Sequence, residues 1–104
     1  MSQGAVVVAS GEIDIATAPS LREALLTASR ASTRVVLDLT GVTFLDSSGL
    51  AVLIQVLKSG DQEQEVSPRL VGPRLLVRRV LDITRLSQKL PIHETVVEAL
   101  EQAI

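Results

Sequence analysis

Cysteine is absent from this 104-residue sequence, and its absence excludes several kinds of chemistry. Without thiols the chain can form no disulfide, no thiolate nucleophile and no cysteine-ligated zinc or iron–sulfur site. Aromatic residues are almost as scarce, because Phe44 is the only one. The chain therefore has no platform for stacking nucleic-acid bases, and we expect a core built from Val, Leu, Ile and Ala.

The sequence also lacks a strong charge of either sign and a long apolar run. Its net charge is −2, which gives no long-range attraction to nucleic acid or to an anionic membrane. The first residues lack a basic segment followed by an apolar stretch, and no run approaches the roughly 20 apolar residues that span a bilayer. We therefore expect a cytoplasmic protein that neither inserts into a membrane nor contacts nucleic acid directly.

Length and composition are those of one compact folding unit. Hydrophobic residues make up 46% of the chain and charged residues 21%, as in soluble globular proteins. A second domain would leave neither half enough interior to bury, so we predict a single domain over residues 1–104.

Hydrophobic periodicity predicts strands that alternate with helices. The predicted strands are Ala5–Ala9, which Glu12–Ala16 would extend, Arg34–Leu39 and Arg69–Val71. The predicted helices are Pro19–Ser29, Asp46–Ser59, one that opens at Gly72-Pro73 and one that follows Pro91. Between them, Thr40–Leu45 is expected to be a connection and Asp61–Glu65 an exposed acidic loop. This order indicates an α/β fold with helices packed against a small sheet.

The predicted helix Asp46–Ser59 is apolar on nearly all sides. A stripe at helical spacing, expected to face the core, is formed by Leu50, Leu53, Ile54 and Leu57. Val52 and Val56 are apolar as well, and Val52 points almost opposite to that stripe. Either the helix is buried on both sides or it leaves an apolar strip for a partner. Because a domain this small has little material for a second cover, we predict that Val52 and Val56 contact a partner protein.

The start of the same helix is suited to carry a phosphate. Free backbone amides and the positive end of the helix dipole stabilise negative charge beside Asp46-Ser47-Ser48. A phosphorylated serine gains about −1.5 to −2 charges, which can repel or remake an adjoining protein surface. The residues alone leave a simpler interpretation open, in which Asp46 or Ser47 is only the N-cap of the helix.

The segment Val35–Leu50, which includes Asp46-Ser47-Ser48-Gly49, resembles the signature of STAS domains, specifically of the anti-sigma factor antagonists. Similar residues flank it at Gly11–Asp14 and Val77–Leu81, so the similarity covers nearly the whole chain. The resemblance implies the STAS fold, an α/β domain in which a small mixed sheet of about four strands packs against about four helices.

The resemblance also implies partner switching without enzymatic activity. In the family, the serine directly after this Asp is phosphorylated by a partner that is both an anti-sigma factor and a serine kinase. That serine is Ser47 here, with Ser48 as the alternative acceptor. The unphosphorylated protein would bind the kinase and release a sigma factor, and a serine phosphatase would reset it. The residues expected at the partner interface are Asp14, Asp46, Ser48, Gly49, Val52 and Val56.

A transport role is the competing interpretation. Stand-alone STAS accessory subunits of lipid-trafficking ABC transporters also resemble this chain, because their helix start is similar to Ser47–Leu53. In that role the helix would dock on an ATPase without phosphorylation. Ser48 favours the antagonist, whereas Ala51 favours the transporter subunit.

Catalysis and metal binding have little support in the sequence. A hydrolase with Ser47 as nucleophile needs a base, and the only histidine, His93, is expected at the start of the last helix. One histidine without a second nearby ligand makes a poor metal site, so we expect neither a metal nor a cofactor.

The first predicted strand raises the question of what lies beside it. STAS proteins usually have an additional strand before the segment that matches Ala5–Ser10. Without that strand the sheet edge would be short or covered by another chain, so a homodimer is compatible with the sequence.

Overall fold

In the residues that the structure describes, four strands alternate with four α-helices. The computed structural model describes residues 4–32, 34–59 and 68–101. The strands are β1 (Ala5–Ile13), β2 (Val35–Leu45), β3 (Arg69–Val71) and β4 (Ile92–His93). The helices are α1 (Ala18–Ala31), α2 (Ser47–Ser59), α3 (Leu75–Ile83) and α4 (Val96–Glu101), with a short 3₁₀ helix at Leu86–Gln88. The α/β fold is confirmed, whereas the acidic loop predicted at Asp61–Glu65 lies outside the described residues.

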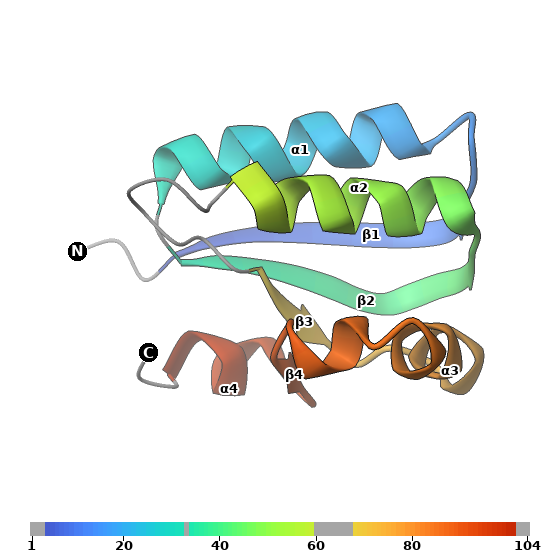
Figure 1. Cartoon of the computed structure of the whole chain (residues 1–104). Helices are drawn as coiled ribbons and strands as arrows, with labels where there is room; N and C mark the ends of the chain where they lie inside the picture. The colour runs from blue at the N-terminus through green and yellow to red at the C-terminus, as the bar shows by residue number, and fades with distance from the viewer. Residues whose placement is uncertain (1–3, 33, 60–67, 102–104) are drawn as a thin grey trace.

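The sheet is parallel in the part of the chain that the structure describes, and the expectation of a mixed sheet is wrong there. Its strands lie in the order β1-β2-β3-β4, and each neighbouring pair is parallel. A helix follows each of the first three strands and returns the chain to the end of the sheet where that strand began (Figure 1). Such β–α–β crossovers join parallel strands.

The long pair β1 and β2 corrects the predicted connection at Thr40–Leu45. These residues continue β2, because β1 also continues past Gly11 and provides backbone partners for them. Gly11 pairs with Val42 after a first shift in register between Val8 and Ser10, and Ile13 pairs with Leu45 after a second shift between Gly11 and Glu12. Ser10-Gly11 therefore forms an irregularity within a strand and not the turn that its residue types suggest.

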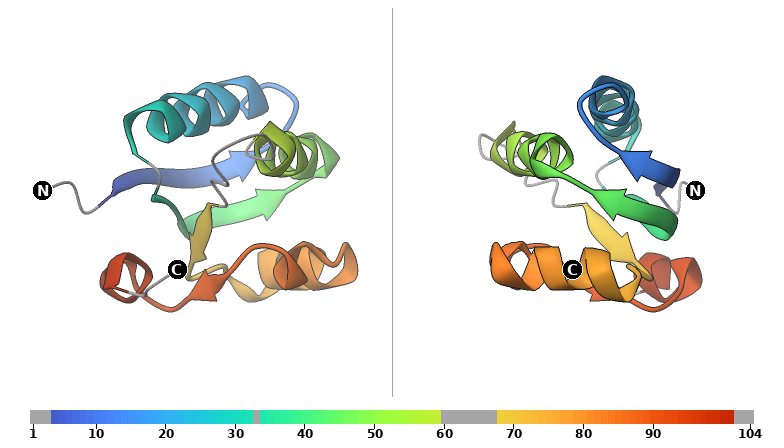
Figure 2. Two further views of the ribbon diagram at one scale, coloured as in Figure 1. Left: turned by 60° about the vertical axis from the view of Figure 1, so that its left-hand side comes forward. Right: turned by 90° about the vertical axis from the view of Figure 1, so that its right-hand side faces the viewer.

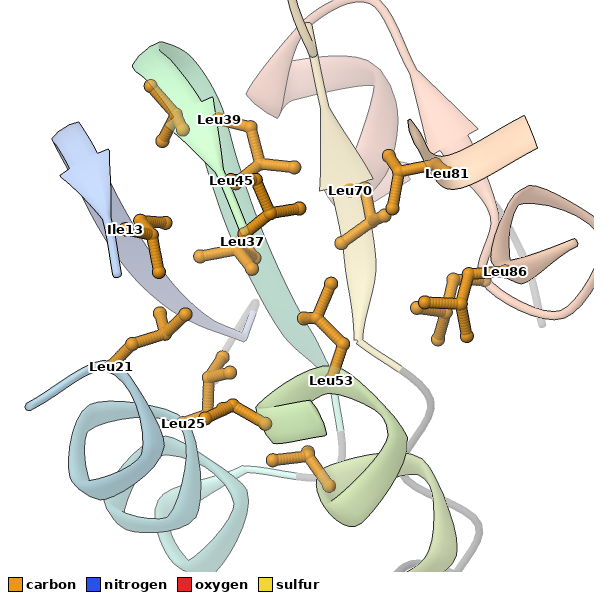
Figure 3. Packing of buried hydrophobic residues seen from close by; sticks show 14 of the residues in the cluster. Ile13, Leu21, Leu25, Leu37, Leu39, Leu45, Leu53, Leu70, Leu81 and Leu86 are labelled. Carbon is orange, nitrogen blue, oxygen red and sulfur yellow. The ribbon is translucent and has the colours of Figure 1, made fainter. Parts of the chain in front are cut away.

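The main core lies on the face of the sheet that α1, α2 and α3 cover. Alternate residues of β2 point to this face, and they meet leucines and valines from all three helices (Figure 3). Leu25 of α1, Leu53 of α2 and Leu81 of α3 are almost completely buried there. The core is aliphatic, as the near absence of aromatic residues predicts.

The opposite face of the sheet has a smaller cover, provided by α4. Val36 and Val71 form a second cluster with Ala99 of that helix. Arg34 and the buried Arg69 donate hydrogen bonds to the carbonyl oxygens of Leu100 and Ala99, respectively. Burial, followed by the charge of Arg34, lowers the pKa of Arg69. The two guanidinium groups anchor the C-terminal end of α4, where the helix dipole favours positive charge.

Two local predictions need correction. The third helix begins at Leu75 and not at the predicted Gly72-Pro73, and its Val77 and Leu81 are buried whereas Leu76 is exposed. His93 lies in β4, not at a helix start, because its backbone carbonyl accepts a hydrogen bond from Gly72 at the end of β3.

Within the described ranges, no helix has both the length and the hydrophobicity to cross a bilayer.

Candidate functional site

The two segments predicted to bear on function, the one that contains Asp14 and the one that contains Asp46 and Ser47, meet at the carboxyl end of the sheet. Ile13 and Leu45, the last residues of β1 and β2, are paired neighbours. The amide of Asp46 donates a hydrogen bond to the carbonyl oxygen of Ile13 at 3.1 Å, which ties the two chain segments together. The β1–α1 turn and the start of α2 therefore lie side by side beyond the carboxyl ends of parallel strands (Figure 1 and Figure 2). Ligands and partners of α/β sheets commonly bind outside the carboxyl ends of the strands.

Asp46 is the N-cap of α2. Its Oδ1 accepts hydrogen bonds from the amides of Ser48, at 2.8 Å, and Gly49, at 3.4 Å. Its own carbonyl oxygen accepts the amide of Leu50, the first hydrogen bond of the helix. Of the two capping interpretations that the sequence left open, the structure selects Asp46.

Ser47 is the first residue of α2 and is exposed to solvent, whereas Ser48 is half-buried. Since Asp46 provides the cap, the capping hydrogen bonds do not involve the Ser47 hydroxyl. A group added to the Ser47 hydroxyl would extend into solvent and remain beside the first amides of the helix. The positive end of the helix dipole stabilises negative charge in this position.

Asp14 shapes the neighbouring turn. Its Oδ1 accepts hydrogen bonds from the amides of Ala16 and Thr17, at 3.0 and 3.1 Å, and from the Thr17 hydroxyl at 3.2 Å. The same hydroxyl donates to the carbonyl oxygen of Glu12 at 3.0 Å. These bonds hold the turn in one shape, and Ile15 at its tip is 80% exposed. Asp14 contributes to this surface at least by fixing the position of Ile15.

Gly49 is buried, which changes the role expected of it. A Cβ at this position would come within 2.8 Å of Ile13 Cγ2 and closer still to Leu45 Cδ1. The glycine lets α2 approach the ends of both strands. Gly49 therefore supports the candidate site from beneath, and the expectation that it contacts a partner is not supported by its burial.

Replacing Gly49 with alanine is expected to lower the free energy of unfolding by about 1–3 kcal/mol, because the added methyl group overpacks two buried side chains. Chemical denaturation monitored by circular dichroism measures this change. Gln55→Ala, at an exposed position of the same helix, is the control and should change stability by less than about 0.5 kcal/mol. A Gly49→Ala protein as stable as the parent would show that the helix does not need this close approach.

The predicted apolar strip of Val52 and Val56 is wrong as an exposed surface. Only 5% of Val52 and 4% of Val56 is exposed, because both belong to the main core. Gly49, Val52, Leu53 and Val56 themselves follow helical spacing, and this set faces the sheet and α1. Of the stripe predicted to face the core, Leu53 is buried and Leu50 packs partly buried against the same core, so the structure buries the two valines in addition to these leucines. Leu57 of that stripe lies outside the described side chains.

The residues that do extend the surface from Ser47 are Ala51, Ile54 and Gln55, all exposed. Ile54 is 39% exposed, although we expected it to face the core. Ile15 and Phe44, the latter 50% exposed near the end of β2, add apolar area at the same end of the molecule. The sequence pointed to neither of them. Its position two residues before a predicted helix, as the single aromatic residue, was the one available signal for Phe44.

The only histidine of the chain lies away from Ser47. His93 lies in β4, two strands away from β2, and its Nδ1 is 3.2 Å from Glu98 Oε1. In the described ranges no three His, Asp or Glu side chains gather in a way that would hold a metal ion. The chemical group that this end of the sheet offers is the accessible hydroxyl of Ser47, next to a capped helix start.

A family model for the STAS domain matches residues 2–99. The chain belongs to the STAS domain family. The anti-sigma-B factor antagonist of Staphylococcus epidermidis is 30% identical to it over 89 residues, which cover 85% of this chain and 82% of that protein. The solved structure of an anti-sigma factor antagonist from Mycobacterium paratuberculosis is 34% identical, with a TM-score of 0.76 over 91% of this chain and 80% of that one. At 19% identity and a TM-score of 0.65, the structure of the antagonist SpoIIAA in its unphosphorylated form, which covers 94% of this chain and 86% of its own, shows a shared fold only.

Within this STAS domain, the matched region contains every residue assigned to the candidate site. One continuous region at the carboxyl end of the sheet includes the helix that begins at Ser47, the turn fixed by Asp14 and the glycine contact beneath them. Phosphorylation and partner choice follow from this geometry only as proposals.

Proposed function

We propose that this STAS domain is a cytoplasmic anti-sigma factor antagonist whose binding is switched by phosphorylation of Ser47. The names of its relatives support the antagonist role. The observation that carries the switch is the position of Ser47, which is exposed at the first residue of a helix already capped by Asp46. A kinase can reach such a hydroxyl without unfolding the domain.

The partner in this proposal is an anti-sigma factor with serine kinase activity. The unphosphorylated domain binds it through the surface formed by Asp14, Ile15, Ser47 and the exposed side of α2. Ile15 and Ile54 supply apolar area there, and such contacts at the centre of an interface carry much of its affinity. Binding occupies the anti-sigma factor and frees a sigma factor, so the chain acts on transcription as a regulator and not as an enzyme.

Phosphorylation reverses the interaction through charge. The kinase transfers the γ-phosphoryl group of ATP to the Ser47 hydroxyl oxygen, which loses its proton as ADP leaves, and the product carries about −1.5 to −2 added charges. The new charge lies beside the carboxylate of Asp46, whose Oδ1 caps the helix. The fold tolerates it because the helix dipole compensates part of the charge, but a partner surface that fits an uncharged serine does not. A serine phosphatase removes the phosphate and restores binding.

Intact-mass spectrometry of the protein purified from its native cells tests the switch. We expect a population heavier by one phosphoryl group, absent from a Ser47→Ala variant and retained in a Ser48→Ala variant. Ser48 is a matched control because it is the adjacent hydroxyl and is half-buried. If no phosphate is present under growth and stress conditions alike, constitutive docking, as in an ABC transporter subunit, becomes the better account.

A further inference from the structure

The outer strand β1 has an edge that no described part of the chain covers. It pairs with β2 on one side only, at the end of the strand order. Edge strands usually resist pairing with other chains by means of charged residues or proline. Residues Ala5–Val8 contain neither and pair with β2 in an unbroken register, so this part of the edge lacks those two forms of protection.

Both faces of the same strand are apolar. Ala5, Val7 and Ala9 pack against the main core, whereas Val6 and Val8 on the opposite face are 41% and 72% exposed. Beside the edge runs a groove of about 210 Å³ between β1 and α1, lined among others by Val7, Val8, Ser20, Leu21 and Ala24. The groove leaves room alongside the strand.

The backbone fixes which groups on this edge are available. The amide of Ala5 donates to the carbonyl oxygen of Arg34 on the β2 side at 2.8 Å. In a strand, the backbone N–H and C=O groups of successive residues point alternately to opposite sides. Ala5 and Val7 therefore point these groups toward β2. The N–H and C=O groups of Val6 and Val8 therefore point away from the sheet. A strand that pairs with this edge must bond to those two residues.

We propose that the occupant is β1 of a second copy, paired antiparallel across a twofold axis at Val7. The sequence Ala5-Val6-Val7-Val8-Ala9 reads the same in both directions, so this register places Val7 opposite Val7 and Val6 opposite Val8. It also pairs the outward-facing groups of Val6 with those of Val8, which is the hydrogen-bonded arrangement of an antiparallel ladder. The outward-facing backbone groups are compatible with this register, and the palindromic side-chain pattern distinguishes it from a pairing centred at Val6 or Val8.

The helix above β1 is complementary to its own copy in this arrangement. Ser20 and Ala24 line the groove, and Thr27 and Ala31 continue the same side of α1 at helical spacing. This stripe of small, uncharged side chains allows two antiparallel helices to approach across the axis. Glu23 and Arg30 lie seven residues apart on the adjacent side of α1, so a twofold axis that crosses the helix midway between them would bring each Glu23 toward Arg30 of the second copy. The dimer would join two four-stranded sheets into one continuous sheet and bury Val6 and Val8 of both chains against each other.

The test is sedimentation velocity over a concentration series, with two double variants that differ in one charge. Val6→Lys/Val8→Lys places lysine opposite lysine on the exposed face in the proposed register, and we expect a monomer. Val6→Lys/Val8→Glu places lysine opposite glutamate at both symmetric sites, and we expect a dimer like that of the parent. Both variants change the same two exposed positions, so their monomers should fold equally well, which circular dichroism checks.

Cysteine cross-linking gives a second readout in this cysteine-free chain. Val7→Cys would place two thiols across the axis in a non-hydrogen-bonded pair with Cα atoms about 4.5 Å apart, within the range of a disulfide. Val8→Cys would place them diagonally, about 7–8 Å apart. Under mild oxidation the first variant is expected to form a covalent dimer in high yield and the second to form little.

A monomeric parent at the highest concentration would overturn the proposal, as would equal masses for the two double variants or equal cross-linking of the two cysteine variants. The first of these results would leave the edge to another segment or partner. The result is independent of the switch, because the proposed pairing uses Ala5–Ala9 whereas Ser47 lies beyond the carboxyl ends of β1 and β2.

Discussion

Replacing Ser47 with aspartate is expected to weaken binding to the kinase anti-sigma factor by about tenfold to a hundredfold. The substitution adds one negative charge at the exposed first residue of α2, beside the carboxylate of Asp46. The partner must then desolvate this charge or meet it with a surface that fits a neutral hydroxyl. The helix dipole stabilises the aspartate in the free protein, so folding is not expected to suffer. Isothermal titration calorimetry with the purified kinase in the presence of ADP measures the loss.

The matched control is Ser47→Asn, which has nearly the shape of the aspartate without its charge. If charge operates the switch, asparagine should bind more tightly than aspartate by most of the predicted factor. Equal affinities for the two variants would mean that shape at this position matters and charge does not. In that case phosphorylation could not act by the electrostatic route described above.

Removing the side chain of Leu53 is expected to produce the largest loss of stability. The Leu53→Ala variant should lose about 3–5 kcal/mol in free energy of unfolding, because the side chain is 1% exposed and sits between α2 and the sheet (Figure 3). The loss combines transfer of the removed atoms to water with the cavity left behind. Urea denaturation followed by circular dichroism provides the measurement, and partner binding should fall in parallel only under conditions where the variant unfolds.

Two neighbouring positions show which side of α2 is buried. Val52→Ala should cost about 1–3 kcal/mol because Val52 is in the core, whereas Ile54→Ala should cost less than about 1 kcal/mol because Ile54 is partly exposed. Ile54→Ala should instead weaken binding to the anti-sigma factor, because the side chain belongs to the proposed interface. A larger loss of stability at Ile54 than at Val52 would restore the orientation of α2 that the sequence first suggested.

The orientation of α2 shows where sequence reasoning reached its limit. Helical spacing correctly predicted the helix and its start, since Asp46 is a good N-cap and an apolar run follows it. Spacing could not determine which side is buried, because residues 50 to 57 are apolar in nearly every direction. That choice depends on how α2 meets α1 and the sheet. Gly49 was the local signal for it, because a helix side that includes glycine can pack most closely.

A strand was predicted correctly where its local residue pattern is clear, and it was missed where that pattern is weak. Arg69–Val71 is short and apolar and was placed correctly, whereas Thr40–Leu45 was missed because its glycine and threonines resemble a loop. Its strand conformation depends on pairing with Gly11–Ile13, a contact between segments about thirty residues apart. The two residues of β4 are too few to show any period. Their strand conformation depends on hydrogen bonds to β3.

The corrected surface makes the proposed switch more compact than the sequence suggested. With Val52 and Val56 in the core, the proposed interface is centred on Ser47 and extends toward Ile15 on one side and Ile54 on the other. A phosphate on Ser47 therefore lies near the middle of the surface and not at its border. Charge at the centre of an interface is costly because the partner must desolvate it.

The most direct test of this account follows the release of a sigma factor from its anti-sigma factor. A fluorescently labelled sigma factor is bound to the kinase anti-sigma factor, and the chain is added either unphosphorylated or phosphorylated at Ser47. The account predicts that the unphosphorylated chain displaces the sigma factor and that the phosphorylated chain leaves the complex intact. Displacement by both forms would contradict the switch, and displacement by neither would contradict the antagonist role itself.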